Sequence, residues 1–189
     1  MSATTAPRAA FVWHRLWLCV LLMLLAAMAS AQTAAMSDEY RIKAAFLHKF
    51  LSYVEWPAAA LAQPGAPFVI GVVGPVEVVQ ELRRVTDGQT VAGHAVTVRR
   101  LTTQEPPLGL HVLYLVGDDG DAPAAQLAAA AGLPVLTVTE SRGDAGGIIN
   151  FTVDENRVRF DIALPAADAN HLKISARLLN VARRVAPRG

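Results

Sequence analysis

The residues of this sequence best suited to metal or acid–base chemistry are its histidines. Four lie beyond residue 31, at His48, His94, His111 and His171. None of them is followed at i+3 or i+4 by another metal-ligating side chain, the spacing that a helical metal site needs. We therefore interpret all four as ordinary surface histidines and predict no metal site.

Three aspartates crowd one loop after a strongly apolar run, at Asp118, Asp119 and Asp121. Carboxylates bind Ca²⁺, but this spacing lacks the alternating ligands and the distal glutamate of a calcium loop. Pro123 begins a predicted helix, and acidic residues are favoured near a helix N-terminus. We interpret the aspartates as helix caps.

No other pattern in the sequence predicts an enzyme. The turn at Gly71 and Gly74 lacks both the dinucleotide fingerprint and the lysine of a P-loop. There is no G-x-S-x-G elbow, and the single cysteine, Cys19, lies near the N-terminus. We predict no catalytic residues and no cofactor.

Two polar residues interrupt apolar helix faces. Lys43 lies within the apolar arc of a predicted helix, where an unpaired buried charge would cost several kcal/mol. It must extend past the helix start, meet a carboxylate or line a pocket. Ser175 interrupts a second apolar arc, where either close packing or a functional hydroxyl would explain it.

The N-terminal segment predicts export. Arg8 and Arg15 precede an apolar run over Leu16–Ala29, and small residues close the segment at Ala31. This pattern is typical of a cleaved signal peptide over residues 1–31, too short to anchor the chain in a membrane. Because Cys19 lies within it, we predict a mature chain without disulfides that does not insert into a membrane.

Residues 32–189 have the length of one ordinary domain. Removing the two N-terminal arginines leaves 15 basic residues against 16 acidic ones, with no basic block. Nucleic acid is therefore not an expected partner.

The apolar pattern predicts an α/β fold. A helix is expected over Ser37–Trp56, ended by Pro57, and continuous apolar runs at Phe68–Val73, Val112–Val116 and Pro134–Val138 predict buried strands. Helix-like segments alternate with these strands, and Val96–Leu101 is expected at an edge or exit. We predict a layered domain with a mostly parallel or mixed sheet of about six strands flanked by helices.

The end of the sequence predicts a β-hairpin and a helix. Ile148–Val153 and Val158–Leu164 flank a polar turn, and the second run alternates apolar with charged residues. A last, largely buried helix is expected from Pro165 to about Val185.

With these elements placed, the chain resembles the YfiR family of periplasmic regulators. The resemblance covers nearly the whole chain beyond residue 31. It is carried by YRIKAAFLHKFLSYVEWP (Tyr40–Pro57), FVIGVVG, GGIINFTVDENRVRFDIAL (Gly146–Leu164) and LKISARLLNVAR (Leu172–Arg183). The first and last motifs are the specific ones.

The resemblance implies a non-enzymatic periplasmic protein that docks on and restrains the periplasmic sensor domain of an inner-membrane signalling enzyme, typically a diguanylate cyclase. Sensor kinases and outer-membrane receptors are further partners that the resemblance implies, so the partner class stays open. Because no cysteine is expected in the mature chain, a switch based on disulfides is not expected. The positions matching the family motifs, interpreted as either packing or partner-binding residues, are Lys43, Phe46, Phe50, Trp56, Arg159, Lys173, Ser175 and Arg177.

Two further functions stay open. A small-molecule-binding sensor domain, linked to a histidine kinase or a transport system, would use Lys43 as the counter-charge of a carboxylate or phosphate. The other is a periplasmic hydrolase that uses a histidine or the aspartates. A homodimer is also compatible with the sequence. Either Val96–Leu101 or the terminal hairpin offers an edge strand that can pair across a twofold axis.

Overall fold

The computed structural model describes Met23, Met36 and residues 38–61, 65–117, 122–140, 146–155 and 157–187. It divides the chain into two compact units, Met1–Glu39 and Tyr40–Gly189. Apart from Met23, the predicted signal peptide lies outside the described residues, and so do the loop aspartates. In the part of the chain that is described, no helix has the length and apolar character needed to cross a membrane.

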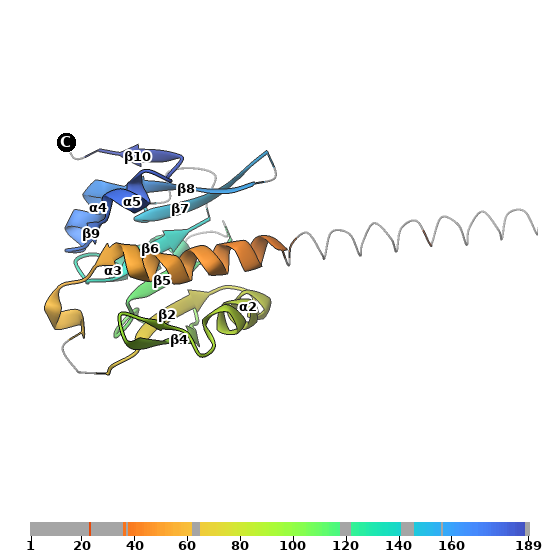
Figure 1. The fold of residues 1–189 in the computed structure, drawn as a ribbon, viewed down its shortest axis with the longest axis horizontal. Coiled ribbons are helices and arrows are strands. Elements are labelled where there is room, and N and C mark those ends of the chain that lie inside the picture. Colours follow the sequence, from red (N-terminus) through yellow and green to blue (C-terminus); the bar gives the residue numbers. More distant parts are fainter. Residues whose placement is uncertain are drawn as a thin grey trace, which may run out of the picture. The chain divides into compact units, whose positions relative to one another are not determined.

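The unit Tyr40–Gly189 contains an eight-stranded sheet in the order β10-β8-β7-β6-β5-β2-β4-β3 (Figure 1). In chain order its strands are β2 (Phe68–Val73), β3 (Thr90–Val91), β4 (His94–Arg100), β5 (Val112–Leu115), β6 (Leu136–Thr139), β7 (Ile149–Asp154), β8 (Arg157–Ala163) and β10 (Arg184–Ala186). All neighbours run parallel except β7 with β8 and β3 with β4. The predicted α/β fold with a mostly parallel or mixed sheet is confirmed, with more strands than the six expected because short edge strands extend it.

Helices cover both faces of this sheet. On one face, the first helix and α2 (Val76–Thr86) pack on alternate residues of the strands, such as Ile70 and Tyr114. On the other face, α3 (Ala122–Ala130) and the segment after β4 cover a smaller cluster that includes Leu113 and Leu115. Both faces are therefore buried, which is why the central strands are continuously apolar in sequence.

The first helix of this unit is shorter than predicted. The described helical residues are 38–53, so the helix ends at Tyr53 rather than at Trp56, and Val54–Glu55 form a two-residue strand, β1. β1 pairs antiparallel with β9 (Lys173–Ile174), placing Val54 opposite Ile174. A short 3-10 helix, η1 (Ala58–Leu61), follows Pro57. The pairing of β1 with β9 brings the two specific family motifs together.

The hairpin is confirmed, but the single long helix over Pro165–Val185 is wrong. The chain forms α4 (Leu164–Ala169), β9, α5 (Ala176–Leu179) and β10 in its place. α4 ends where Asn170 turns its side chain inward, donating to Val135 O at 2.8 Å and accepting from Gly132 N at 3.1 Å. His171 then takes a left-handed conformation (φ 57°), which a helix cannot continue.

Candidate functional site

A groove of about 360 Å³ lies between the first helix, β8 and the segment around α5. We call it the terminal groove, since it joins the first and last family motifs. Its lining residues are Phe46, Lys49, Phe50, Tyr53, Val158, Arg159, Phe160, Arg177, Leu178 and Val181. Four of the eight residues predicted from the sequence therefore come together here: Phe46, Phe50, Arg159 and Arg177.

The first helix supplies one wall of the terminal groove by its periodicity. Phe46, Lys49, Phe50 and Tyr53 follow the i, i+3, i+4, i+7 spacing that places side chains on one helix face. Sequence reasoning identified Phe46 and Phe50 but missed Lys49 and Tyr53. The same spacing could have identified both.

The base of the groove is aromatic. Phe160 packs edge-to-face against Phe46 and Phe50, with ring centroids 5.4 and 5.2 Å apart. Phe50 and Phe160 are buried, whereas Phe46 is only partly covered. Edge-to-face pairs of this kind each add roughly 0.5–1.5 kcal/mol beyond the burial of their surface. The base is thus a rigid apolar surface with Phe46 accessible on it.

Two cations lie beside this apolar base. Lys49 on the first helix and Arg177 on α5 are both exposed, and no carboxylate among the described residues forms an ion pair with either. Arg159, on β8 next to Phe160, is exposed and also lines the groove. The groove combines apolar surface with positive charge from Lys49 and Arg177 that no described carboxylate pairs with.

The end of the chain is fastened against the sheet by a buried carboxylate. Arg183 Nε and Nη2 donate to the two oxygens of Asp161 at 2.8 and 2.5 Å, and Arg184 Nη2 donates at 3.1 Å. The hydrogen bond from Arg183 holds the pKa of Asp161 below its usual range. Sequence reasoning missed this pair, which fixes the segment that follows α5.

Lys43 lies in the interior rather than in the groove. Its side chain is 4% exposed, and Nζ is 3.0 Å from Glu140 Oε1. The hydroxyl of Tyr114, a residue of β5, donates to the same oxygen. Of the outcomes expected for this lysine, the structure has the carboxylate partner, so Lys43 has its charge already matched.

The remaining predicted residues occupy structural positions outside the groove. Trp56 packs against Phe68 and His111, with ring centroids 5.3 and 6.2 Å away. Lys173 is exposed on β9, opposite Glu55. Ser175 is the N-cap of α5, where its Oγ accepts from Leu178 N at 3.4 Å, and its own N–H donates to Tyr53 O at 2.9 Å.

His111 is buried, which corrects the expectation that all four histidines lie at the surface. Val69 N donates to its Nδ1 at 3.1 Å, so Nε2 carries the proton and donates to Ala60 O at 3.0 Å. Burial lowers the pKa of His111, with the Ala60 carbonyl opposing and His94 adding to that effect. The imidazole is held neutral as a link between η1 and the sheet. Within the described ranges, no cluster of three or more metal-ligating side chains occurs.

These features define an α/β protein whose terminal groove can receive an apolar group carrying negative charge. Compared with models of known families, residues 40–183 match the one described as YfiR/HmsC-like. The match covers well over half of the chain, and the chain belongs to the YfiR/HmsC-like family. A comparison with curated proteins gave no match. Membership of this family suggests a periplasmic regulator of diguanylate cyclase signalling.

Proposed function

We propose that this protein is a periplasmic, non-enzymatic regulator that docks on the sensor domain of an inner-membrane diguanylate cyclase and restrains it. The terminal groove is its docking surface. Family membership supports the signalling system, and the predicted signal peptide supports the compartment. The observation that carries the docking surface is the convergence of both specific family motifs on one aromatic groove.

The chemistry of the groove specifies the occupant. Lys49 and Arg177 are exposed without a carboxylate partner among the described residues, and Phe46, one turn before Lys49 on the same helix, is only partly buried. Aromatic and arginine side chains are the usual anchors of protein interfaces, and complementary charge steers the partner. The partner segment is therefore apolar with flanking aspartate or glutamate.

The buried pair of Lys43 and Glu140 supports the docking surface without touching the partner. It ties the first helix to the end of β6, while the β1–β9 pairing ties the end of that helix to the segment before α5. The two walls of the groove are thus fixed before the partner arrives. Preorganised walls lower the entropy that binding would otherwise lose.

The test is the intracellular cyclic-di-GMP level in a strain that lacks the gene. We expect the level to rise and to fall again when the gene is restored with residues 1–31 intact. A copy without residues 1–31 should leave it high. An unchanged level in the deletion strain, or full restoration by the copy that lacks residues 1–31, would contradict the proposal.

A further inference from the structure

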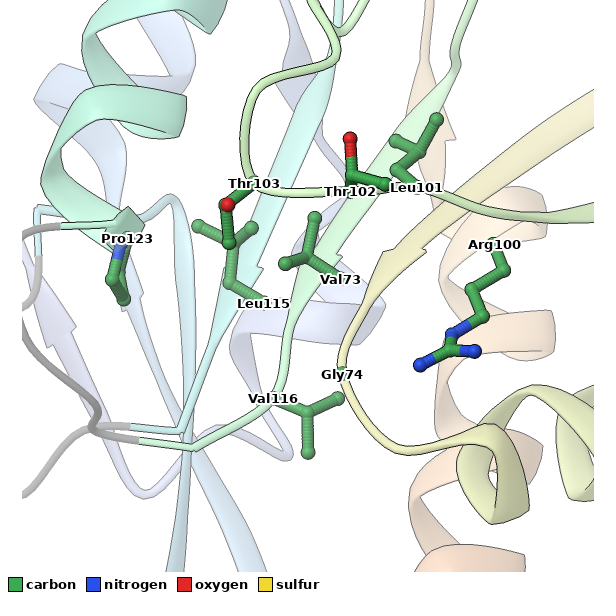
Figure 2. Close-up of a pocket in the computed structure, with 9 residues that line it drawn as sticks. All are labelled: Val73, Gly74, Arg100, Leu101, Thr102, Thr103, Leu115, Val116 and Pro123. Atoms are coloured by element: carbon green, nitrogen blue, oxygen red, sulfur yellow. The ribbon is translucent and has the colours of Figure 1, made fainter.

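A second cavity, of about 510 Å³, lies at the carboxyl ends of β2, β4 and β5 (Figure 2). We call it the switch-point cavity. It shares no lining residue with the terminal groove. Neither the family match nor the docking proposal gives it a role.

The order of the strands explains why a cavity forms at this place. From β2 the chain passes through α2 to β4, toward one edge of the sheet; from β5 it passes through α3 to β6, toward the other. Because such crossovers are right-handed, the two helices lie on opposite faces, as the two apolar clusters show. The neighbouring carboxyl ends of β2 and β5 are left as a crevice, the usual ligand position in open α/β sheets.

The lining of the switch-point cavity joins a cation to an apolar surface. Arg100, the last residue of β4, is exposed, and its side chain has no ion pair or hydrogen bond among the described residues. Figure 2 shows its guanidinium extending toward the turn at Gly74. Buried Leu115 and partly buried Pro123 lie across that turn.

Hydrogen-bonding groups surround the same cavity. Thr102 and Thr103 line it, both exposed. The helix α2 begins two residues after Gly74, and no side chain caps its first N–H groups, which lie at the positive end of the helix dipole. Gly74 is required there, because an added Cβ would lie 2.6 Å from Val116 Cβ. The turn therefore packs directly against Val116, and both residues line the cavity.

The wall that carries these threonines is held rigidly. Buried Gln126 on α3 donates to the carbonyls of Thr103 and Glu105, at 2.7 and 2.9 Å. Glu105 Oε2 accepts from Thr102 N at 2.8 Å. Leu101 N donates to Val72 O at 2.8 Å, which continues the strand pairing up to the cavity. The cavity is built before any ligand arrives.

We propose that the switch-point cavity binds a small organic anion, a carboxylate or a phosphate ester with an apolar part. Arg100 holds the anionic group near the start of α2, and the apolar part lies against Leu115 and Pro123. The volume is within the range of roughly 300–1,000 Å³ typical of small-molecule sites. This differs from the counter-charge role considered for Lys43, whose charge is matched by Glu140. The protein thus has a ligand site separate from its docking surface.

The experiment uses phenyl phosphate, which has an anionic head and an apolar ring, as its probe. Backbone amide shifts of the labelled protein are followed by NMR during titration with phenyl phosphate and, separately, with inorganic phosphate and phenol. We expect saturable shifts over residues 73–76, 100–103 and 115–117. Phenyl phosphate should bind more tightly than either fragment, because only it engages both halves of the cavity.

Two matched variants decide the role of the arginine. Arg100→Gln should weaken phenyl phosphate binding by about tenfold or more, the loss expected for a hydrogen bond to a charged group. Arg99→Gln alters the adjacent exposed arginine of β4, outside the cavity lining, and should leave the affinity unchanged. Both substitutions are on exposed side chains, so the fold should persist.

Three results would overturn the proposal. One is no saturable shift with phenyl phosphate at millimolar concentration. Another is a set of shifts centred on the terminal groove instead of the strand ends. The third is equal weakening by Arg99→Gln and Arg100→Gln, which would show nonspecific attraction to a basic surface.

Discussion

Lys43 and Lys49 lie on one helix, and the structure uses them in opposite ways. Lys43 is buried and paired with Glu140; Lys49 is exposed at the terminal groove, with no carboxylate paired to it among the described residues. Six residues along a helix place the two side chains roughly 120° apart around its axis, so they point to different sides. The neighbouring elements, rather than the lysine itself, decide whether such a charge stabilises the fold or faces a partner.

The comparison separates two kinds of substitution. Changes at Lys43 should act on stability, because they leave an uncompensated carboxylate in the interior. Changes at Lys49 and Arg177 should act on partner binding, because these side chains have no ion pair to lose within the described part of the chain.

The largest effect is expected from Lys43→Ala. Removing one partner of a buried ion pair costs about 3 kcal/mol, because the remaining charge keeps its desolvation penalty without the attraction. Urea unfolding of the purified protein measures this loss. The double variant Lys43→Met/Glu140→Gln should recover much of the lost stability. A Lys43→Ala variant as stable as the unaltered protein would contradict the structural role of Lys43.

Lys49→Glu tests the other face of the helix. We expect binding to the periplasmic domain of the cyclase to weaken by tenfold to a hundredfold, about 1.4–2.8 kcal/mol, because the groove would repel an acidic segment. The midpoint of urea unfolding should move little. Arg99→Glu, on an exposed arginine of β4 outside the groove, is the matched control. Equal binding by the Lys49 and Arg99 variants would count against the groove.

The buried, neutral His111 should make the stability of the fold depend on pH. Its pKa is lowered by burial, so the unfolded chain takes up the proton first and acid favours unfolding. Stability from this group is full above the ordinary histidine pKa, about 6.5, and falls as the pH drops below it. His111→Gln should lose about 1–3 kcal/mol above that pH, and less below it, as measured by unfolding across pH 5–8. If the unfolding free energy of the His111→Gln variant falls with decreasing pH as steeply as that of the unaltered protein, His111 is not the cause of that pH dependence.

Ser175→Ala gives the smallest expected change. Loss of the N-cap of α5 should cost about 1 kcal/mol of unfolding free energy. Ser175→Asp, which also caps helices, should retain most of the stability. Neither variant should weaken partner binding strongly. If both do, although Ser175→Asp is as stable as the unaltered protein, the hydroxyl of Ser175 itself contacts the partner.

The sequence predicted the sheet well because buried parallel strands are continuous apolar runs. Phe68–Val73 and Val112–Leu115 were recognisable for that reason, and the alternation in Arg157–Ala163 predicted the hairpin. The end of the chain was predicted less well. Its apolar residues, such as Leu172 and Leu178, have helical spacing but are buried by several short elements.

The sequence predicted part of the lining of the terminal groove. Phe46 and Phe50 belong to a family motif, and their helix spacing also points to Lys49 and Tyr53. The partner of Lys43 could not be predicted, because Glu140 lies far along the sequence on another element and only the packed sheet brings them together. The same holds for the switch-point cavity, which depends on strand order.

The most direct test of the central claim is cyclic-di-GMP in the deletion strain carrying a Lys49→Glu/Arg177→Glu copy, exported at the level of the unaltered copy. The Arg99→Glu copy is the control. We predict that the unaltered and control copies lower cyclic-di-GMP and that the groove variant, though folded, leaves it high. Full restoration by the groove variant would contradict docking through the terminal groove.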